Sequence, residues 1–325
     1  MINTGVFIGR FQPPHPGHIA ALSIAASQCK ELIVLVGSAN QCRSIKNPWT
    51  FQERKDMLFK KLRTAGVKNV KILPLNDHPY NDPAWITEVK QLVLSTTYYI
   101  TNIVLFGHMK DGNNYLKWFP EFGYREVGSQ YNINATQVRE QMFAQNDPEM
   151  PQTVRDDWEY YKREKELFSK YPFPETLNFN CGDAVVLCLD KVLLIQRARA
   201  PGRGAWALPG GFKNANETFL DCAIRELQEE TNIRVPEKVI RGSVVKTQLF
   251  DSPKRSFGIN RNTLAVMIRI QPDPDGKPPR ANGADDAAAC GWFSVDDALN
   301  VMELYDDHSA IIAEMTGIVP RVKLD

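Results

Sequence analysis

The sequence predicts an α/β protein of two domains, a doubly wound parallel sheet followed by an α+β domain. Its 325 residues are about twice the roughly 150 residues of a typical single domain. Up to about residue 145, short apolar runs alternate with helical patterns, which is typical of a parallel sheet covered by helices on both faces. After Asn146, several prolines and a charged helical pattern interrupt this alternation. We therefore expect a domain over 1–146, a helical linker over 147–176 and a second domain over 177–325.

The first half shows the alternation in order. A strand is expected where β-branched apolar residues form a short run between turn residues, and a helix where apolar residues recur every three or four positions. The expected strands are 5–8, 32–36, 70–73, 103–106 and 124–127, and the expected helices are 17–29, 50–65, 83–97 and 134–144. Ligands of such a sheet bind at the carboxyl ends of the strands.

The second half mixes strands with fewer helices, which predicts an α+β domain. A charged and aromatic helix is expected over 153–170, before Pro172 and Pro174. The expected strands are 184–189, 192–195, 239–246 and 264–270, one strong helical pattern covers 217–230, and 272–279 is a turn-rich loop.

The composition excludes several functional classes. Thirty-nine Lys and Arg residues balance 38 Asp and Glu residues, so net charge favours neither nucleic acid nor a membrane surface as partner. No apolar run approaches the roughly 18 residues of a membrane span. The cysteines form no Cys-x-x-Cys pair, which is typical of reduced thiols rather than zinc ligands or disulfides. We expect a cytoplasmic protein with small-molecule ligands, and homo-oligomer formation stays open.

The stretch from Gly9 to His18 carries the clearest chemistry of the first half. It follows the first expected strand and opens the first helix, where unpaired backbone N–H groups attract phosphate. Gly9 and Gly17 let the backbone approach a ligand closely, while Arg10, His15 and His18 add cations or donors. Such groups stabilise charge on a pyrophosphate leaving group. No serine or cysteine nucleophile pairs with these histidines, so direct in-line transfer is favoured. A proline-rich turn whose histidines only cap the helix is the alternative.

This stretch resembles the His-x-Gly-His nucleotidyltransferases, and more closely the archaeal-type nicotinamide mononucleotide (NMN) adenylyltransferases, over about the first 145 residues. The resemblance implies a Rossmann-like fold that joins ATP to NMN, giving NAD and pyrophosphate with Mg²⁺. It also implies that His15 and His18 bind the ATP phosphates, with Arg10 beside them. The other loop residues that it places at the nucleotide are Gly9, Phe11 and Gly17.

Two further segments extend this resemblance through residue 86. Within 37–54, Arg54 would reach the nucleotide phosphates. Residues 81–86 resemble the pyridine pocket of the family, in which the Trp85 indole would stack on the nicotinamide ring. Taken alone, a tryptophan on a helix is more often a core residue.

Residues 133–139 resemble the second signature of the family, Ile-Ser-x-Thr-x-x-Arg. The pattern is that of a capped helix start, where Thr136, Arg139 and backbone N–H groups can hold β- and γ-phosphates. Asn134 stands where the family has serine, and it is also a good cap. Gly107 and Asp111, at and after the fourth strand, would face the nucleotide, although a plain strand-end loop is an equal alternative.

A glutamate-rich helical pattern carries the chemistry of the second half. Glu226, Glu229 and Glu230 are three and four residues apart, so their carboxylates are expected on one side of a helix. Clustered carboxylates repel one another unless a hard cation neutralises them, and oxygen ligands suit Mg²⁺ or Mn²⁺. Arg225, four residues before Glu229, can orient it. A solvated acidic helix face is the alternative.

The same segment resembles the Nudix hydrolases over 211–233, with the spacing Gly-x5-Glu-x7-Arg-Glu-Leu-x-Glu-Glu. In that family a glutamate-bound divalent metal activates water to cleave a nucleoside diphosphate linked to another group. The resemblance implies a Nudix fold and metal ligation by Gly211, Glu226, Glu229 and Glu230. Within this set Glu226 and Glu229 would be catalytic, with Glu217 and Arg225 in support. Asn232 stands where glycine is usual, which predicts a left-handed backbone that asparagine tolerates.

The combination resembles the bifunctional NMN adenylyltransferase/ADP-ribose pyrophosphatases over nearly the full length. Residues 250–258 resemble a loop of ADP-ribose pyrophosphatases, although a surface hairpin explains them nearly as well. The implied second reaction converts ADP-ribose into AMP and ribose 5-phosphate. One alternative is a cytidylyl- or pantetheine-phosphate-type transferase with a Nudix domain for NADH or dinucleoside polyphosphates. Another is a nucleotide-sensing regulator, which the intact carboxylates disfavour.

Overall fold

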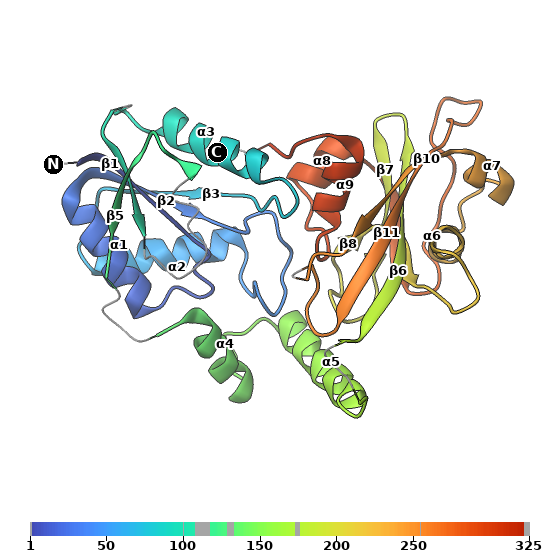
Figure 1. Cartoon of the computed structure of the whole chain (residues 1–325), viewed down its shortest axis with the longest axis horizontal. Helices are drawn as coiled ribbons and strands as arrows, with labels where there is room; N and C mark the ends of the chain where they lie inside the picture. The colour runs from blue at the N-terminus through green and yellow to red at the C-terminus, as the bar shows by residue number, and fades with distance from the viewer. Residues whose placement is uncertain are drawn as a thin grey trace. The chain divides into compact units, whose positions relative to one another are not determined.

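The computed structural model describes residues 2–99, 101–107, 118–128, 133–172, 176–253 and 255–321 (Figure 1). The chain divides into two compact units. The first contains the residues up to Asn40 and Asn47–Pro151, and the second contains Gln41–Lys46 and Gln152–Arg321. A short segment of the first half of the sequence, residues 41–46, therefore belongs to the second unit.

The apolar runs of the first half pair in parallel, in the order β3-β2-β1-β4-β5. The register places Val6 opposite both Ile33 and Leu105. The strand order reverses between β1 and β4, and such a reversal opens a crevice at the carboxyl ends of the strands. The strands are β1 (Ile2–Gly9), β2 (Cys29–Val36), β3 (Val70–Pro74), β4 (Ile103–Gly107) and β5 (Gly123–Glu126).

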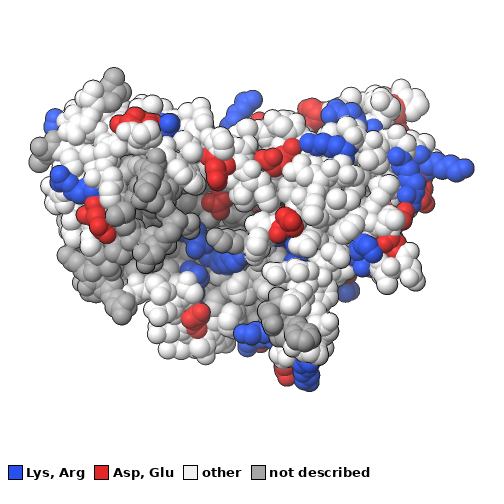
Figure 2. Space-filling view, viewed as in Figure 1, with Lys and Arg blue, Asp and Glu red and all other residues white. Residues whose placement is uncertain are grey.

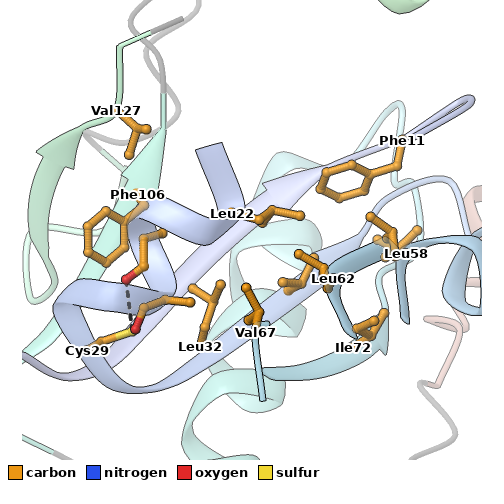
Figure 3. Close-up of a cluster of buried hydrophobic side chains, with 14 of the residues drawn as sticks. Phe11, Leu22, Cys29, Leu32, Leu58, Leu62, Val67, Ile72, Phe106 and Val127 are labelled. Carbon is orange, nitrogen blue, oxygen red and sulfur yellow. Dashed lines mark hydrogen bonds between the residues drawn. The ribbon is translucent and has the colours of Figure 1, made fainter. Parts of the chain in front are cut away.

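Helices cover both faces of this sheet, which confirms the doubly wound α/β prediction. Alternate residues of β2 enter two different apolar clusters, as the pleat requires. One cluster contains Leu22, Leu58 and Leu62 from two helices (Figure 3), and the other contains Val89 and Leu92 from a third. The helices are α1 (Pro16–Gln28), α2 (Phe51–Thr64), α3 (Asp82–Thr96) and α4 (Ala135–Ala144).

The second unit contains a mixed sheet in the order β10-β11-β6-β7-β12, with β8 paired to β7 and β9 to β6. The pair β11–β6 is parallel, and the pairs flanking it are antiparallel. The expected α+β character of this half is thereby confirmed. The strands are β6 (Asn178–Cys188), β7 (Lys191–Arg197), β8 (Trp206–Ala207), β9 (Gly210–Phe212), β10 (Val244–Phe250), β11 (Asn260–Arg269) and β12 (Ala287–Ser294).

Helix α6 packs its apolar side on β6 and β11 through Ala223, Ile224 and Leu227 (Figure 1). The expected strand over 239–246 is wrong, because its first part forms α7. Pro236 stands at the N-cap, and Glu237 pairs with Arg241 one turn later, a spacing that stabilises helices. The helices of this unit are α5 (Gln152–Phe168), α6 (Phe219–Thr231), α7 (Glu237–Gly242), α8 (Val295–Asn300) and α9 (His308–Thr316).

Helix α5, expected within a linker, lies in the second unit. Its Asp157 accepts a hydrogen bond from the Gly202 N–H at 2.9 Å. Its Glu164 forms a buried ion pair with Arg261 on β11. The hydrogen bond of Asp157 and the ion pair of Glu164 fix the helix to the unit.

The cysteines, the charged side chains and the helices bear on the expectations drawn from the composition. All six cysteines are free, and four of them are buried. Acidic and basic side chains lie close together over much of the face shown in Figure 2. Among the described residues, no helix combines the length and the apolar character needed to span a membrane.

Candidate active sites

The loop after β1 lies at the carboxyl end of a central strand, beside the reversal of strand order. His15 caps α1, and its backbone N–H donates to Nδ1 of His18 at 3.3 Å. Since that ring nitrogen accepts, a neutral His18 carries its proton on Nε2 and can donate it to a ligand. The two imidazole rings stack with centroids 3.6 Å apart, and the Phe11 ring meets His18 edge-on at 5.0 Å. The structure thus brings the predicted histidines together at a helix N-terminus, where phosphate binds favourably.

Gln12 connects this loop to the segment before α2. Its amide donates to the Trp49 carbonyl at 2.8 Å and accepts from the Trp49 N–H at 3.1 Å. Gln12 is 1% exposed, so the paired amide fixes the loop backbone. Sequence reasoning missed this residue because only the position of Trp49 reveals its role.

Arg54 is fully buried, and its guanidinium forms hydrogen bonds with backbone carbonyl groups. It donates to the carbonyls of Arg10, Gly37, Ser38 and Thr50, at 2.6 to 3.2 Å. Burial lowers its pKa to about 10, so it stays charged at neutral pH. This position does not support the predicted direct contact with phosphate. Arg54 instead holds together the loop after β1 and the segment after β2.

A second buried arginine reaches the loop from α4. Arg139 donates to the Gln12 carbonyl at 2.6 Å and to the Thr136 hydroxyl at 3.3 Å. Burial and the nearby Arg10 charge lower its pKa. Asn134 caps this helix by accepting from the Gln137 N–H at 2.8 Å. Exposed Arg10 therefore lies in a region whose positive charge suits a polyphosphate.

The predicted pyridine pocket begins at the N-terminus of α3. Asn81 caps the helix by accepting from the Ala84 N–H at 3.0 Å. Trp85 is half-buried, with its ring 6.0 Å from those of Trp118 and Phe119. Trp85 packs against the apolar cluster on this side of the sheet, and part of its indole stays accessible.

Gly107 ends β4 beside the reversal of strand order. Its carbonyl accepts from the Val127 N–H at 2.9 Å and from the Tyr124 hydroxyl at 3.3 Å. Asp111 lies outside the described residues.

The carboxylate site of the second unit is built on β9 and α6. A Cβ atom on Gly211 would lie 2.5 Å from Oε1 of Glu226, so only glycine leaves room for that carboxylate. The carbonyl of Gly211 accepts from the Cys222 thiol at 3.5 Å. Desolvation by burial raises the pKa of Glu226.

Arg225 organises three of the glutamates. Its Nη1 donates to Glu226 at 2.7 Å and to Glu229 at 2.8 Å, and its Nη2 donates to Glu217 at 2.8 Å. Hydrogen bonding to Glu217 is the largest cause of the raised pKa of Arg225. Glu217 also accepts from the Asn214 N–H at 2.6 Å. The contact to Glu229 is the one that the four-residue spacing predicts.

Glu230 points to a different partner, the Gly210 N–H, at 3.0 Å. The three predicted metal-binding carboxylates are therefore not preassembled, and the described residues contain no ready group of three metal-ligating side chains. Burial raises the pKa of Glu230 to about 8 and that of Asp183 on β6 to about 6. Asp183 was not predicted from the sequence, although an acidic residue within the apolar run of β6 could have indicated it.

These observations fit a hard cation. Desolvation by burial is the largest cause of the raised pKa values of Glu226, Glu230 and Asp183, and a bound cation would favour the charged forms of these acids. Their donor atoms are oxygens, and the missing Cβ of Gly211 leaves space beside Glu226. Oxygen donors suit Mg²⁺ and Mn²⁺ rather than zinc.

Two further features of the second unit are the end of helix α6 and the ion pair of Arg255. Asn232 ends α6 with φ 41° and ψ 37°, which confirms the predicted left-handed conformation. In the loop after β10, Arg255 forms a buried two-pronged ion pair with Asp307 at 2.9 and 3.0 Å. Such paired geometry gives a fixed orientation.

Comparisons with known proteins give matches to both halves of the chain. The cytidylyltransferase-like family matches residues 6–100, and the NUDIX domain family matches residues 182–315. The nicotinamide/nicotinic acid mononucleotide adenylyltransferase of Acinetobacter baylyi is 39% identical over 137 residues, which are 42% of this chain and 72% of that protein. A nicotinamide-nucleotide adenylyltransferase of Pyrococcus horikoshii is 35% identical over 145 residues, 43% of this chain and 73% of that protein.

A solved structure extends the likeness to nearly the whole chain. The bifunctional NMN adenylyltransferase/ADP ribose pyrophosphatase of Francisella tularensis superposes with a TM-score of 0.86 at 32% identity, covering 98% of this chain and 99% of that one. A further structure of that Francisella tularensis enzyme, complexed with AMP and a manganese ion, gives a TM-score of 0.85 at 31% identity over the same shares of the two chains. The chain therefore belongs to the family of bifunctional NMN adenylyltransferase/ADP-ribose pyrophosphatases.

Proposed function

We propose that the first unit transfers the adenylyl group of ATP to NMN, and that the second hydrolyses ADP-ribose to AMP and ribose 5-phosphate. The observation that carries the first activity is the stacked His15–His18 pair at the N-terminus of α1. The observation that carries the second is the Glu226–Arg225–Glu229 cluster facing Gly211.

In the first reaction the nucleophile is the phosphate of NMN, so the chain needs no covalent nucleophile of its own. That phosphate attacks the α-phosphorus of ATP, a new P–O bond forms, and the bond to the leaving pyrophosphate breaks. Arg10 and the Nε2–H of His18 face the growing negative charge on pyrophosphate, with the N–H groups of α1. Donors aimed at charge that develops in the transition state accelerate the reaction.

The buried groups beneath this loop keep the donors in place. Arg54 and Arg139 each donate to loop carbonyls at 2.6 Å. Preorganised donors need no rearrangement during the reaction, which is the main source of such electrostatic catalysis.

Titration with NMN tests the first proposal. In wild type, saturating NMN should quench tryptophan fluorescence, because the nicotinamide ring stacks on Trp85. The Trp85→Phe variant should lose most of the quenching and still make NAD from ATP with a higher KM for NMN. Unchanged wild-type fluorescence at saturating NMN would refute the stacking role. Absence of NAD formation would refute the activity.

In the second reaction the nucleophile is water, and the products are two phosphate monoesters. A divalent cation held by Glu226 and Glu229, with Glu230 completing the site, would neutralise the pyrophosphate and make bound water more acidic. Arg225 orients the first two carboxylates. Glu226 or Glu229 accepts the proton that the attacking water loses, as a positioned general base.

A substrate panel tests the second proposal. The purified protein is incubated with Mg²⁺ and ADP-ribose, NADH, NAD or diadenosine polyphosphates, and products are separated by chromatography. We expect AMP from ADP-ribose at a rate well above that for the other compounds. Equal cleavage of NAD or NADH would refute the assignment to ADP-ribose.

The proposed setting follows from the thiols and the charge. Six free cysteines support a reducing compartment, the cytoplasm. The balance of 39 basic and 38 acidic residues supports small-molecule substrates rather than nucleic acid.

A further inference from the structure

A buried acid on α3, Glu88, joins the pyridine-pocket helix to the loop that precedes it. Its Oε1 accepts from the Asn76 N–H at 2.7 Å, and its Oε2 accepts from Nε2 of His78 at 2.6 Å. The side chains of Glu88 and His78 are each 5% exposed. A buried carboxylate needs such partners, because its desolvation is costly otherwise. Both oxygens of Glu88 are thus committed to one loop.

That loop has a second attachment, to the end of β2. Asp77 accepts from the Ser38 N–H at 3.2 Å, and its own N–H donates to Asn40 at 3.0 Å. The loop that leads to α3 is therefore fixed on two sides, by Asp77 to the segment after β2 and by Glu88 to α3.

Glu88 lies three residues after Trp85, and residues with this spacing occupy the same side of a helix. The loop held by Glu88 continues into Asn81, which caps α3. The position of Trp85 relative to the loop is thus set by the two hydrogen bonds of Glu88. Nothing in the proposed chemistry of adenylyl transfer uses this pair.

We propose that the Glu88–His78 pair is a positioning device for the pyridine half of the substrate. It holds the loop over 76–81 and the Trp85 side of α3 at the spacing that NMN requires, and it does not touch the reacting phosphates. This inference rests on the proposed adenylyl transfer to NMN. It predicts that damage to the pair weakens recognition of NMN and leaves recognition of ATP intact.

The test is the Glu88→Gln variant, which keeps the size of the side chain. Glutamine offers one acceptor and one donor group, so it cannot accept from Asn76 and His78 as the carboxylate does. We expect the KM for NMN to rise roughly tenfold, which corresponds to about 1.4 kcal/mol. The KM for ATP and kcat should stay within about twofold. Quenching of Trp85 fluorescence should show the same tenfold loss in NMN affinity.

The matched control is Glu121→Gln. Glu121 pairs at 2.7 Å with Lys90, which lies on the same helix as Glu88, and the side chains of Lys90 and Glu121 are 35% and 43% exposed. Exposed pairs contribute little, so this variant should match wild type in both KM values. Circular dichroism and thermal unfolding report in every variant whether the first unit is folded, because ADP-ribose hydrolysis tests only the second unit.

Each outcome decides the inference. Equal rises in both KM values, or a loss of kcat alone, would overturn it, as would wild-type kinetics in Glu88→Gln. If Glu88→Gln fails to fold, His78→Gln leaves the Asn76 bond in place and should raise the KM for NMN by a smaller factor. No rise in that variant would equally overturn the inference. A wild-type protein that makes no NAD would instead refute the proposed function.

Discussion

Substitution of Gly211 by alanine gives the sharpest test of the carboxylate site. The added Cβ would lie 2.5 Å from Oε1, 2.6 Å from Cδ and 2.8 Å from Oε2 of Glu226. The φ of Gly211 is not positive, so alanine brings no backbone strain there. The three atoms nearest to the added Cβ therefore all belong to this carboxylate.

The size of the effect follows from the distances. Ordinary van der Waals contact begins at 3.4 Å, so the carboxylate has to retreat by about 0.9 Å from its place 2.5 Å away. A misplacement of about 1 Å in a catalytic group costs on the order of 100-fold in rate, or about 2.7 kcal/mol in the barrier. The cost in stability should be smaller, about 1 kcal/mol, because a glutamate end can move.

The assay compares kcat/KM for ADP-ribose in the Gly211→Ala variant and in a Gly242→Ala control. A Cβ on Gly242 meets no atom within 4 Å, so this control changes the same residue type in open space. We expect a loss of about 100-fold for the first variant and wild-type rates for the second, with NAD synthesis unchanged in both. Wild-type hydrolysis by Gly211→Ala would refute the role of this space beside Glu226.

Three further predictions follow from the structure. The His18→Ala variant should lose at least about 100-fold in NAD synthesis while hydrolysing ADP-ribose normally, and loss of both activities in a folded protein would contradict independent sites. Removal of divalent cations with a chelator should abolish hydrolysis, and added Mg²⁺ should restore it without any change in thermal unfolding of the first unit; hydrolysis that survives chelation would contradict a metal role for Glu226 and Glu229. Burial raises the pKa of Asp157 to about 6, above the value of roughly 3.9 in an unfolded chain, so ionisation of this group destabilises the fold as pH rises through about 6. The Asp157→Asn variant keeps an acceptor for the Gly202 N–H, so its free energy of unfolding should exceed that of wild type by up to roughly 3 kcal/mol at pH 7.5 and should equal it at pH 4. Urea unfolding at both pH values measures this difference. Equal gains at the two pH values would contradict the raised pKa of Asp157.

Most of the fold of the first unit could be predicted, because local sequence patterns and packing agree there. Each expected strand and helix over 5–144 is present within a few residues, since apolar runs and helical periodicity both point to the same elements. The strand expected over 239–246 failed because β-branched residues suggested extension, while Pro236 and the Glu237–Arg241 pair start a helix. Local chemistry at the helix start outweighed β propensity.

The roles of individual charged residues were harder to predict. Arg54 and Arg225 both belong to sequence motifs, yet the first donates to four carbonyls and the second to three carboxylates. An arginine suits either set of acceptors, and only the fold determines which set surrounds it. The role of Glu88 was equally hard to predict, because its partners Asn76 and His78 lie 12 and 10 residues away in the sequence, outside any helical spacing.

The chemistry of the second unit limits where its substrate selectivity can arise. ADP-ribose and NAD share the pyrophosphate and differ at the distal ribose, where NAD carries the nicotinamide. In the proposed reaction, the carboxylates around Arg225 act on the shared pyrophosphate, so they would lower the barrier for both compounds alike. Discrimination has to come from groups that contact the part that differs.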